Sequence, residues 1–300
     1  DDTVRRLVMS DVVVARLHDD QPVAMWAGSG SPSRGIGLRS GSAHEVKIID
    51  ADGTLVGTVD ESRAPSLVHE GAVYLHRGQT YKVDHFDPDE LLAVVNPVAD
   101  DEYTQPRTST DISVIAIDDK QAVGPLELML GQVEVTTQVT GYQRRERRSR
   151  KILSHEELEL EPQRLVTRAF WYTIEHRICE DVGVATSQLP GALHAAEHAM
   201  IGMLPLFTIC DRWDVGGVST AMHQDTLHPS IFIYDGYPGG TGIAELGYQV
   251  AGRHLRATLD LLRACGCKDG CPSCVVSPKC GNGNEPLDKA GAIALLTLAP

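Results

Sequence analysis

The sequence predicts an α+β protein: a small β-barrel or β-sheet domain, followed by a mixed α/β, helix-rich domain that ends in a cluster of cysteines. Short β-branched runs separated by turn signals fill the first half, and apolar residues recur at helical spacing in the second. Five of the seven cysteines lie close together near the end. We expect three parts: residues 1–34, the remnant of a preceding domain with a Gly/Ser/Pro-rich linker at 28–34; residues 35–150, the β-rich domain; and residues 151–300, the domain that carries the cysteines.

Two hairpins are expected in the β-rich domain. Residues 46–59 place Asp52-Gly53 between alternating apolar runs, and Asp-Gly is a strong turn signal. Residues 72–83 form the second expected hairpin, with the turn at Arg77-Gly78-Gln79. The polar stretch 97–110 is expected to be an exposed loop. Further strands are expected at residues 91–95, 112–117 and 133–139.

The second half is expected to mix helices with short strands. Apolar residues from 193 to 207 follow helical spacing behind the break Pro190-Gly191, and a long helix is expected at 243–264. That helix leads directly into the cysteine cluster. A last helix follows Pro286, and strands are expected at 164–174 and 231–234.

Charge and composition narrow the function classes. The chain has 300 residues, an apolar fraction of 42% and a formal net charge of -14, which suits a globular protein of two domains and opposes general phosphate binding. No apolar run approaches the ~20 residues of a membrane helix, so no membrane partner is expected. The chain begins with Asp1 rather than Met, so we expect a fragment or processed form of a longer protein.

The cysteines predict a closed metal site. Cys265-Gly-Cys267 is joined by three residues to Cys271-Pro-Ser-Cys274, and four thiolates at this spacing reach one tetrahedral ion. The odd cysteine count and the tight spacing oppose a disulfide framework. Four soft sulfurs favour a structural Zn²⁺ over copper or an iron–sulfur cluster, although sulfur ligation alone leaves iron open. Cys280 is an alternative ligand in place of Cys265.

A second candidate site is His194-Ala-Ala-Glu197-His198. Two histidines at i and i+4 share one helical face, and this pattern is the inverted zinc-peptidase signature, with the glutamate as general base. The alternative is structural, because an apolar helix can place both histidines at a packed interface. Residues 239–242, rich in glycine, form either an anion cradle or a sharp turn. The chain contains no Gly-x-x-x-x-Gly-Lys-Ser/Thr motif, so no ATP site is expected in it.

One segment is strongly basic, although the chain as a whole carries a net negative charge. Residues 144–151 carry six positive charges, and such a cluster can contact a nucleic-acid backbone. A solvated linker between domains explains the same run equally well. The candidate contacts are Arg144, Arg145, Arg147, Arg148, Arg150 and Lys151.

Five motifs in one order resemble a known family. They are Gly71-Ala-Val-Tyr-Leu-His76, His194-Ala-Ala-Glu197-His198, Cys210-Asp-Arg-Trp-Asp-Val-Gly-Gly217, Phe232-Ile-Tyr-Asp-Gly-Tyr-Pro-Gly-Gly240 and Gly270-Cys-Pro-Ser-Cys274. From about residue 35 to the end, the chain resembles the carboxy-terminal region of the MrfA (mitomycin repair factor A) helicases of superfamily two. Their relatives, the SftH and RecQ-like Hrq helicases, are similar to it as well.

The resemblance implies an accessory region of an ATP-dependent 3′–5′ DNA helicase that serves DNA repair and guides single-stranded DNA beside the motor. The RecA-like motor domains, with their ATP and Mg²⁺, would lie outside this chain, so no activity is expected of the chain itself. The family's zinc ligands correspond to Cys265, Cys267, Cys271 and Cys274. The resemblance further implies contact with the motor domains, a monomeric state and a cytoplasmic location at the bacterial nucleoid. A zinc peptidase or a protein-interaction module are the alternatives.

Overall fold

The chain forms two compact units, Asp1–His44 and Glu45–Pro300. The computed structural model describes residues 2–19, 21–28, 44–99 and 101–298. The first unit contains helix α1 (Asp2–Met9) and an antiparallel hairpin of strands β1 (Val13–His18) and β2 (Gln21–Trp26). Of the predicted linker at 28–34, residues 29–34 lie outside the described residues.

The second unit begins with a five-stranded sheet in the order β4-β3-β7-β6-β5. Its strands are β3 (Glu45–Asp50), β4 (Leu55–Asp60), β5 (Val73–His76), β6 (Gln79–Asp87) and β7 (Leu92–Pro97), with the short helix α2 (Ala64–Leu67) between β4 and β5. The two predicted hairpins are present as β3–β4 and β5–β6. Strand β3 pairs with β7 in parallel, which closes a small core around Val46, Ile48 and Val83.

A second, six-stranded antiparallel sheet joins both halves of the chain. Strand β9 pairs with β8 along one edge and with β11 and β10 along the other, and β11 continues to β13 and β12. The strands are β8 (Glu102–Val123), β9 (Leu126–Glu146), β10 (Ile152–Glu157), β11 (Gln163–Thr173), β12 (Val215–Thr220) and β13 (Ser230–Asp235). Strands from before and after the basic segment therefore share one sheet.

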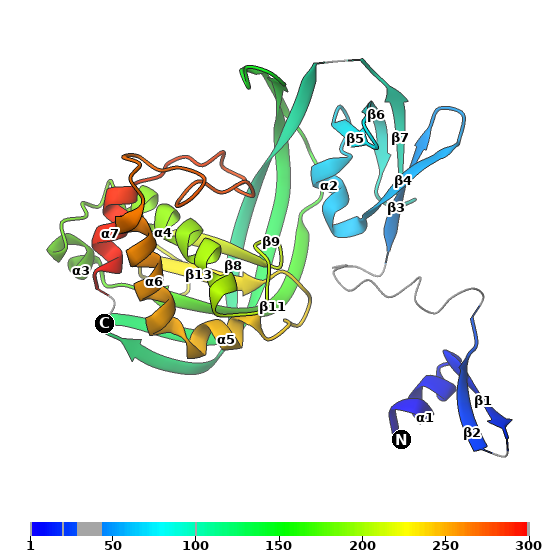
Figure 1. The fold of residues 1–300 in the computed structure, drawn as a ribbon, viewed down its shortest axis with the longest axis horizontal. Helices are drawn as coiled ribbons and strands as arrows, with labels where there is room; N and C mark the ends of the chain where they lie inside the picture. Colours follow the sequence, from blue (N-terminus) through cyan, green and yellow to red (C-terminus); the bar gives the residue numbers. More distant parts are fainter. Residues whose placement is uncertain (1, 20, 29–43, 100, 299–300) are drawn as a thin grey trace. The chain divides into compact units, whose positions relative to one another are not determined.

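The long hairpin β8–β9 curls because its register shifts. Shifts occur at Arg107/Thr108, Val114/Ala116 and Ile117/Asp119. Each extra residue bends the strand and increases its twist, so the sheet curves into a half-barrel (Figure 1). Gly131 lies opposite one shift, where an added Cβ would come within 2.0 Å of the Ala116 carbonyl oxygen. A larger residue does not fit at this position.

The predicted loop at 97–110 is wrong over most of its length, because residues 102–110 belong to β8. Among the strands that the structure describes, β8 pairs with β9 alone, so it is an edge strand. Its first half is partly exposed and rich in Thr, Ser and Gln. Polar side chains of this kind suit an exposed edge, where they resemble a loop in the sequence.

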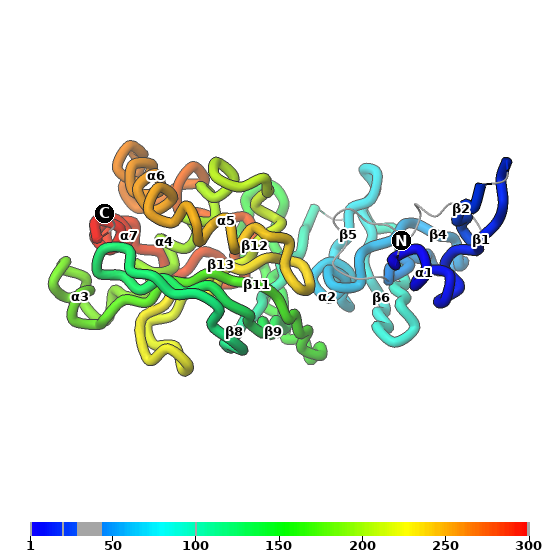
Figure 2. The backbone as a smooth tube through the Cα atoms, turned by 90° about the horizontal axis from the view of Figure 1, so that it is seen from below, coloured from blue at the N-terminus to red at the C-terminus, as the bar shows by residue number. Residues whose placement is uncertain are grey.

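Helices cover one face of the six-stranded sheet. They are α3 (His176–Asp181), α4 (Leu189–Met203), α5 (Ile243–Gln249), α6 (Ala251–Ala264) and α7 (Lys289–Leu296). Helices α4, α5 and α6 gather on one side of β11 and β13 (Figures 1 and 2). Among the described helices, none has the length and apolar character that a membrane crossing requires.

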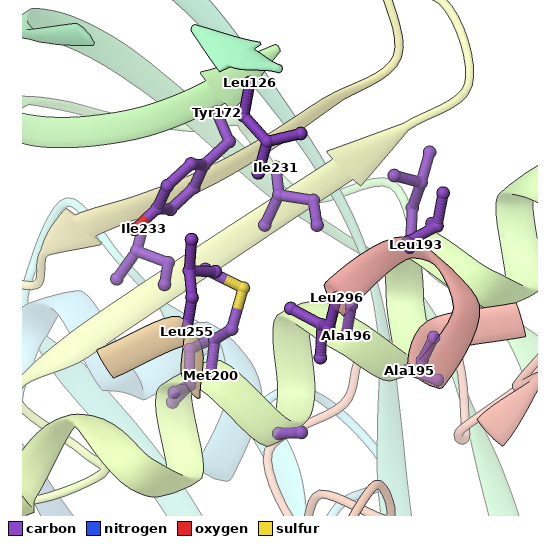
Figure 3. Packing of buried hydrophobic residues seen from close by; sticks show 14 of the residues in the cluster. Leu126, Tyr172, Leu193, Ala195, Ala196, Met200, Ile231, Ile233, Leu255 and Leu296 are labelled. Carbon is purple, nitrogen blue, oxygen red and sulfur yellow. The ribbon is translucent and has the colours of Figure 1, made fainter. Parts of the chain in front are cut away.

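The buried residues of β11 and β13 alternate between two cores. Figure 3 shows Tyr172 and Ile233 facing Met200 and Leu255 of the helix layer. Their neighbour Trp171 points to the opposite face, where its ring stacks on Phe232 with centroids 5.3 Å apart. Both faces of these strands are buried, which explains why their sequences are continuously apolar.

Two helices differ from their predicted bounds. The helix expected at 193–207 begins at Leu189, since Pro190 is tolerated in the first turn, and it ends at Met203 before a short 3₁₀ turn. The single helix expected at 243–264 is broken at Val250, which has φ -104° and ψ 10°. Helix α5 can therefore lie directly on the sheet, where Gly247 approaches Phe170 so closely that an added Cβ would lie 2.4 Å from the ring.

Candidate metal centre and adjoining polar groove

Four cysteine sulfurs converge just beyond the end of α6. Cys265 caps the helix with an extended backbone, which turns the chain away from the helix axis. Gly270 has φ 123°, a conformation that side chains disfavour, and it turns the chain back. The amide of Cys274 donates to the Cys271 carbonyl at 3.0 Å and closes a tight turn. This turn brings the second cysteine pair, Cys271 and Cys274, against the first, Cys265 and Cys267.

The sulfur positions fit a four-coordinate Zn²⁺ ion. Neighbouring sulfurs of the cluster lie 3.4, 3.5, 3.6 and 3.7 Å apart. Four Zn–S bonds of ~2.3 Å at tetrahedral angles place sulfurs about 3.8 Å apart. A disulfide would need about 2.05 Å, and all seven cysteines are free. The donor set therefore suits a closed site with no open position.

Lys289 places a positive charge beside this cluster. Its Nζ donates to the carbonyls of Cys265 and Cys267 at 2.7 and 2.8 Å and lies 3.3 Å from the Cys267 sulfur. Four thiolates around one dication carry a net charge of about -2, which a neighbouring ammonium stabilises. Sequence reasoning missed Lys289, because a lysine 22 residues beyond Cys267 gives no local signal.

Cys280 lies with the predicted histidine pair instead. Its sulfur is 3.4 Å from His194 Nε2, and the donor atoms of His194, His198 and Cys280 all lie within 4.8 Å of one another. Nδ1 of His194 is 2.8 Å from the Pro286 carbonyl oxygen, and Nδ1 of His198 is 2.7 Å from that of Val275. Each ring therefore has one nitrogen held by the backbone and the other directed toward the sulfur. We call these three residues the His-His-Cys group.

The surroundings of this group are polar and partly enclosed. Burial opposes ionisation of the Cys280 thiol, but hydrogen bonds with His198 and the Asn284 amide outweigh it and lower the thiol pKa. Glu197 lines the same cavity of about 310 Å³ but is not among the converging donors. Its Oε2 accepts a hydrogen bond from Ser219 at 2.7 Å, and burial raises the pKa of its carboxyl group.

The basic segment forms the end of β9 and the turn to β10. Some of its arginines form ion pairs with acidic residues, and others do not. Arg144 forms an ion pair with Glu102 at 2.7 Å. Arg148 lies 3.7 Å from Asp101. Arg145 and Arg147 donate to the neutral side chains of Gln143 and Thr80, so their charges are not compensated by these contacts. Arg145, Arg147 and Arg150 line one hollow of about 520 Å³, together with Tyr103, Gln105, Gly283 and Asn284.

This arginine hollow is the first of three hollows that share lining residues. A hollow of about 300 Å³ shares Gln105 and Gly283 with it, and the cavity of the His-His-Cys group shares Thr108 and Gly281 with that second hollow. At Gly281 an added Cβ would come within 1.9 Å of the Thr108 hydroxyl, so the 280–284 loop packs closely on β8. We call this row of three hollows the polar groove.

The glycine-rich residues 239–242 do not offer free amides to an anion. The buried carboxylate of Asp235 accepts hydrogen bonds from the amides of Thr241, Ile243 and Ala244. The side chain therefore already occupies the start of α5. The sharp-turn interpretation of these residues is correct, with Gly239, Gly240 and Gly242 at positive φ.

Comparison with known proteins shows which helicases this chain resembles. Residues 196–275, which include the four clustered cysteines, match the family model of the MrfA Zn-binding domain. The chain is 32% identical over 267 residues to YprA, an uncharacterized ATP-dependent helicase of Bacillus subtilis, which covers 87% of this chain and 35% of the relative. A crystal structure of the DUF1998 helicase MrfA bound to DNA matches 99% of this chain and 39% of that chain, with a TM-score of 0.63 at 28% identity.

The chain matches the carboxy-terminal region of the MrfA-type helicases. The ATP-dependent helicase HRQ1 of Saccharomyces cerevisiae is a further relative, 24% identical over 307 residues, which covers 95% of this chain and 28% of the relative. The resemblance to MrfA and Hrq helicases is thereby confirmed, and so is the α+β fold. The MrfA-type region spans about a third of the length of YprA and of HRQ1.

Proposed function

We propose that this MrfA-type region guides single-stranded DNA along the polar groove, beside the motor of an ATP-dependent 3′–5′ helicase that serves DNA repair. The main support for the proposal is the arginine hollow. It brings Arg145, Arg147 and Arg150 together at one end of the groove, although the chain as a whole has a net charge of -14. Guanidinium groups contact phosphates through charge and hydrogen bonds. The DNA-bound MrfA relative supports the same class of ligand.

The groove favours backbone contact over base reading. Its middle hollow is lined mainly by small polar residues and glycine, such as Thr108, Ser109 and Gly281, together with Arg107. Base stacking would need aromatic platforms, and the groove has few of them: Tyr103 lines the arginine hollow, and Tyr234 lines the cavity of the His-His-Cys group. Contacts of this kind hold a strand without sequence preference, which suits a strand that moves through the groove.

The zinc is proposed to be structural, bound by Cys265, Cys267, Cys271 and Cys274. When bound, the ion supplies four Zn–S bonds that hold a loop-rich segment in one geometry. Cys274 and Val275 pack into the main core, so the site anchors the segment to the helix layer. Its position between α6 and the 280–284 loop supports a role in shaping one wall of the groove.

ATP and Mg²⁺ are assigned to motor domains outside this chain, with which the region would act in one monomeric, cytoplasmic enzyme. The absence of a Walker A sequence from the 300 residues supports this division. The chain by itself is expected to bind DNA without hydrolysing ATP.

Replacing Arg145, Arg147 and Arg150 together with glutamine should weaken binding of a fluorescein-labelled oligothymidylate by at least about tenfold at low salt. Each lost phosphate contact should also make the slope of log K against log salt shallower by about 0.7, giving about 2 for the triple variant. Fluorescence anisotropy of the chain over a salt series measures both quantities.

The matched control replaces Arg253, Arg256 and Arg263, which are exposed on α6, with glutamine. It removes the same charge and should keep the wild-type slope within about one half. An arginine-hollow variant with the wild-type slope would refute the proposed DNA path.

Lys289→Met should lower the affinity of the four-cysteine cluster for zinc without removing a ligand. Loss of a group that supports metal ligands typically lowers metal affinity about 10- to 100-fold. We therefore expect zinc to transfer to a competing chelator at correspondingly lower chelator concentration, measured with a colorimetric zinc indicator. The control Lys268→Met removes an exposed lysine that lies between Cys267 and Cys271, and it should leave the transfer curve unchanged.

A further inference from the structure

We propose that His194, His198 and Cys280 bind a second transition-metal ion of the Zn²⁺ class, at the end of the polar groove. Imidazole nitrogen and thiolate sulfur are the two donors that Zn²⁺ favours in proteins. This site is separate from the four-cysteine cluster and uses none of its sulfurs.

The donor distances fit one ion. A Zn–N bond of ~2.0 Å and a Zn–S bond of ~2.3 Å at a tetrahedral angle place nitrogen and sulfur about 3.5 Å apart. Cys280 Sγ and His194 Nε2 lie 3.4 Å apart, and all three donors lie within 4.8 Å of one another. The two imidazole rings are adjacent, with centroids 4.2 Å apart, because they occupy positions i and i+4 on α4.

The surrounding backbone prepares both rings for a metal. Nδ1 of each histidine faces a carbonyl oxygen, of Pro286 for His194 and of Val275 for His198. A carbonyl accepts only, so Nδ1 carries the proton, and Nε2 keeps its lone pair for a ligand. This pairing of a ligating histidine with a backbone carbonyl is typical of metal sites.

The third donor is also held in place. The amide of Asn284 lies 3.2 Å from the Cys280 sulfur and donates to it. The Asn284 side chain in turn bonds both the amide and the carbonyl of Ser277, at 2.7 and 3.0 Å. The loop that carries Cys280 is therefore fixed across its base, so the sulfur need not move to meet the histidines.

The group leaves one coordination position open. Three protein ligands of a tetrahedral ion leave a fourth place, and the donors line a cavity of about 310 Å³ that shares lining residues with the middle hollow of the groove. Water or a ligand from the groove can fill this place. The second site therefore differs in kind from the closed four-cysteine cluster.

The test is the zinc content of the 1–300 chain, dialysed against micromolar Zn²⁺, desalted and measured by inductively coupled plasma mass spectrometry. We expect about two zinc ions per chain in the wild type and about one in Cys280→Ser and His198→Ala. The control variants Cys210→Ser and His18→Ala change residues outside both clusters and should keep about two.

A wild-type content of one zinc per chain, lost in Cys274→Ser, would overturn the second site whatever the variants do. Cys280→Ser is nearly isosteric, and its circular dichroism should match the wild type, so its zinc count reports ligation rather than folding. Cobalt substitution adds an independent measurement. We expect the visible spectrum of the cobalt-loaded wild type to differ from that of cobalt-loaded Cys280→Ser. The difference spectrum should show the bands of a site with one sulfur ligand. Identical spectra for the two proteins would also contradict the proposal.

Discussion

The Cys274→Ser variant should lose the zinc of the four-cysteine cluster and more than about 4 kcal/mol of stability. Cys274 is 5% exposed, and its sulfur lies within 3.7 Å of two other sulfurs of the cluster. Without the Zn²⁺ ion, the three remaining cysteine sulfurs stay crowded beside the buried Lys289, and no dication holds them together. Urea unfolding followed by circular dichroism measures the stability, and a zinc indicator measures the metal released.

Cys210→Ser is the control for this experiment. Cys210 is half-buried and lies outside both metal-ligating groups, so its replacement should cost less than about 1 kcal/mol and leave the zinc content unchanged. If Cys274→Ser retained both its zinc and its urea midpoint, the assignment of Cys274 as a ligand would be wrong.

Trp171→Ala should destabilise the second unit by about 4 kcal/mol. Trp171 is 0% exposed and stacks on Phe232 in the core on the face of the sheet opposite the helices. Truncation leaves a cavity between two adjacent strands, since these residues are direct partners in β11 and β13. The midpoint of urea unfolding gives the change.

Two comparison variants show whether packing is the cause. Trp171→Phe keeps an aromatic ring in the core and should lose less than half as much stability. Trp26→Ala removes a tryptophan that is 43% exposed in the first unit and should have little effect. Equal losses for Trp171→Ala and Trp26→Ala would contradict the two-core description of the sheet.

Local signals predicted the elements whose formation depends on nearby residues. Asp52-Gly53 marks the turn of β3–β4, and the helical spacing behind Pro190 marks α4. The first part of the long strand β8, before the strand predicted at 112–117, escaped prediction because its polar residues are stabilised by β9, a partner across a hairpin of more than forty residues. The break at Val250 likewise depends on how closely α5 packs on Phe170, which no local pattern reports.

The candidate sites likewise divide into those that nearby residues predict and those that depend on distant contacts. The four clustered cysteines lie within ten residues, so their spacing alone indicated a metal site. The partners of Cys280 lie about 80 residues earlier on α4, and only the packing of the 280–284 loop on that helix brings them together. The arginines needed the structure for another reason: the sequence shows six positive charges but not that Glu102 and Asp101 compensate two of them.

The central claim is that DNA follows the polar groove, and photo-cross-linking tests it most directly. The 1–300 chain is irradiated with an oligothymidylate that carries 4-thiothymidine, and the modified peptides are mapped by mass spectrometry. We predict cross-links in residues 103–109, 143–151 and 281–284, the segments that contribute most residues to the lining of the arginine hollow and the middle hollow. Cross-links confined to other parts of the chain, with none in these three segments, would contradict the account.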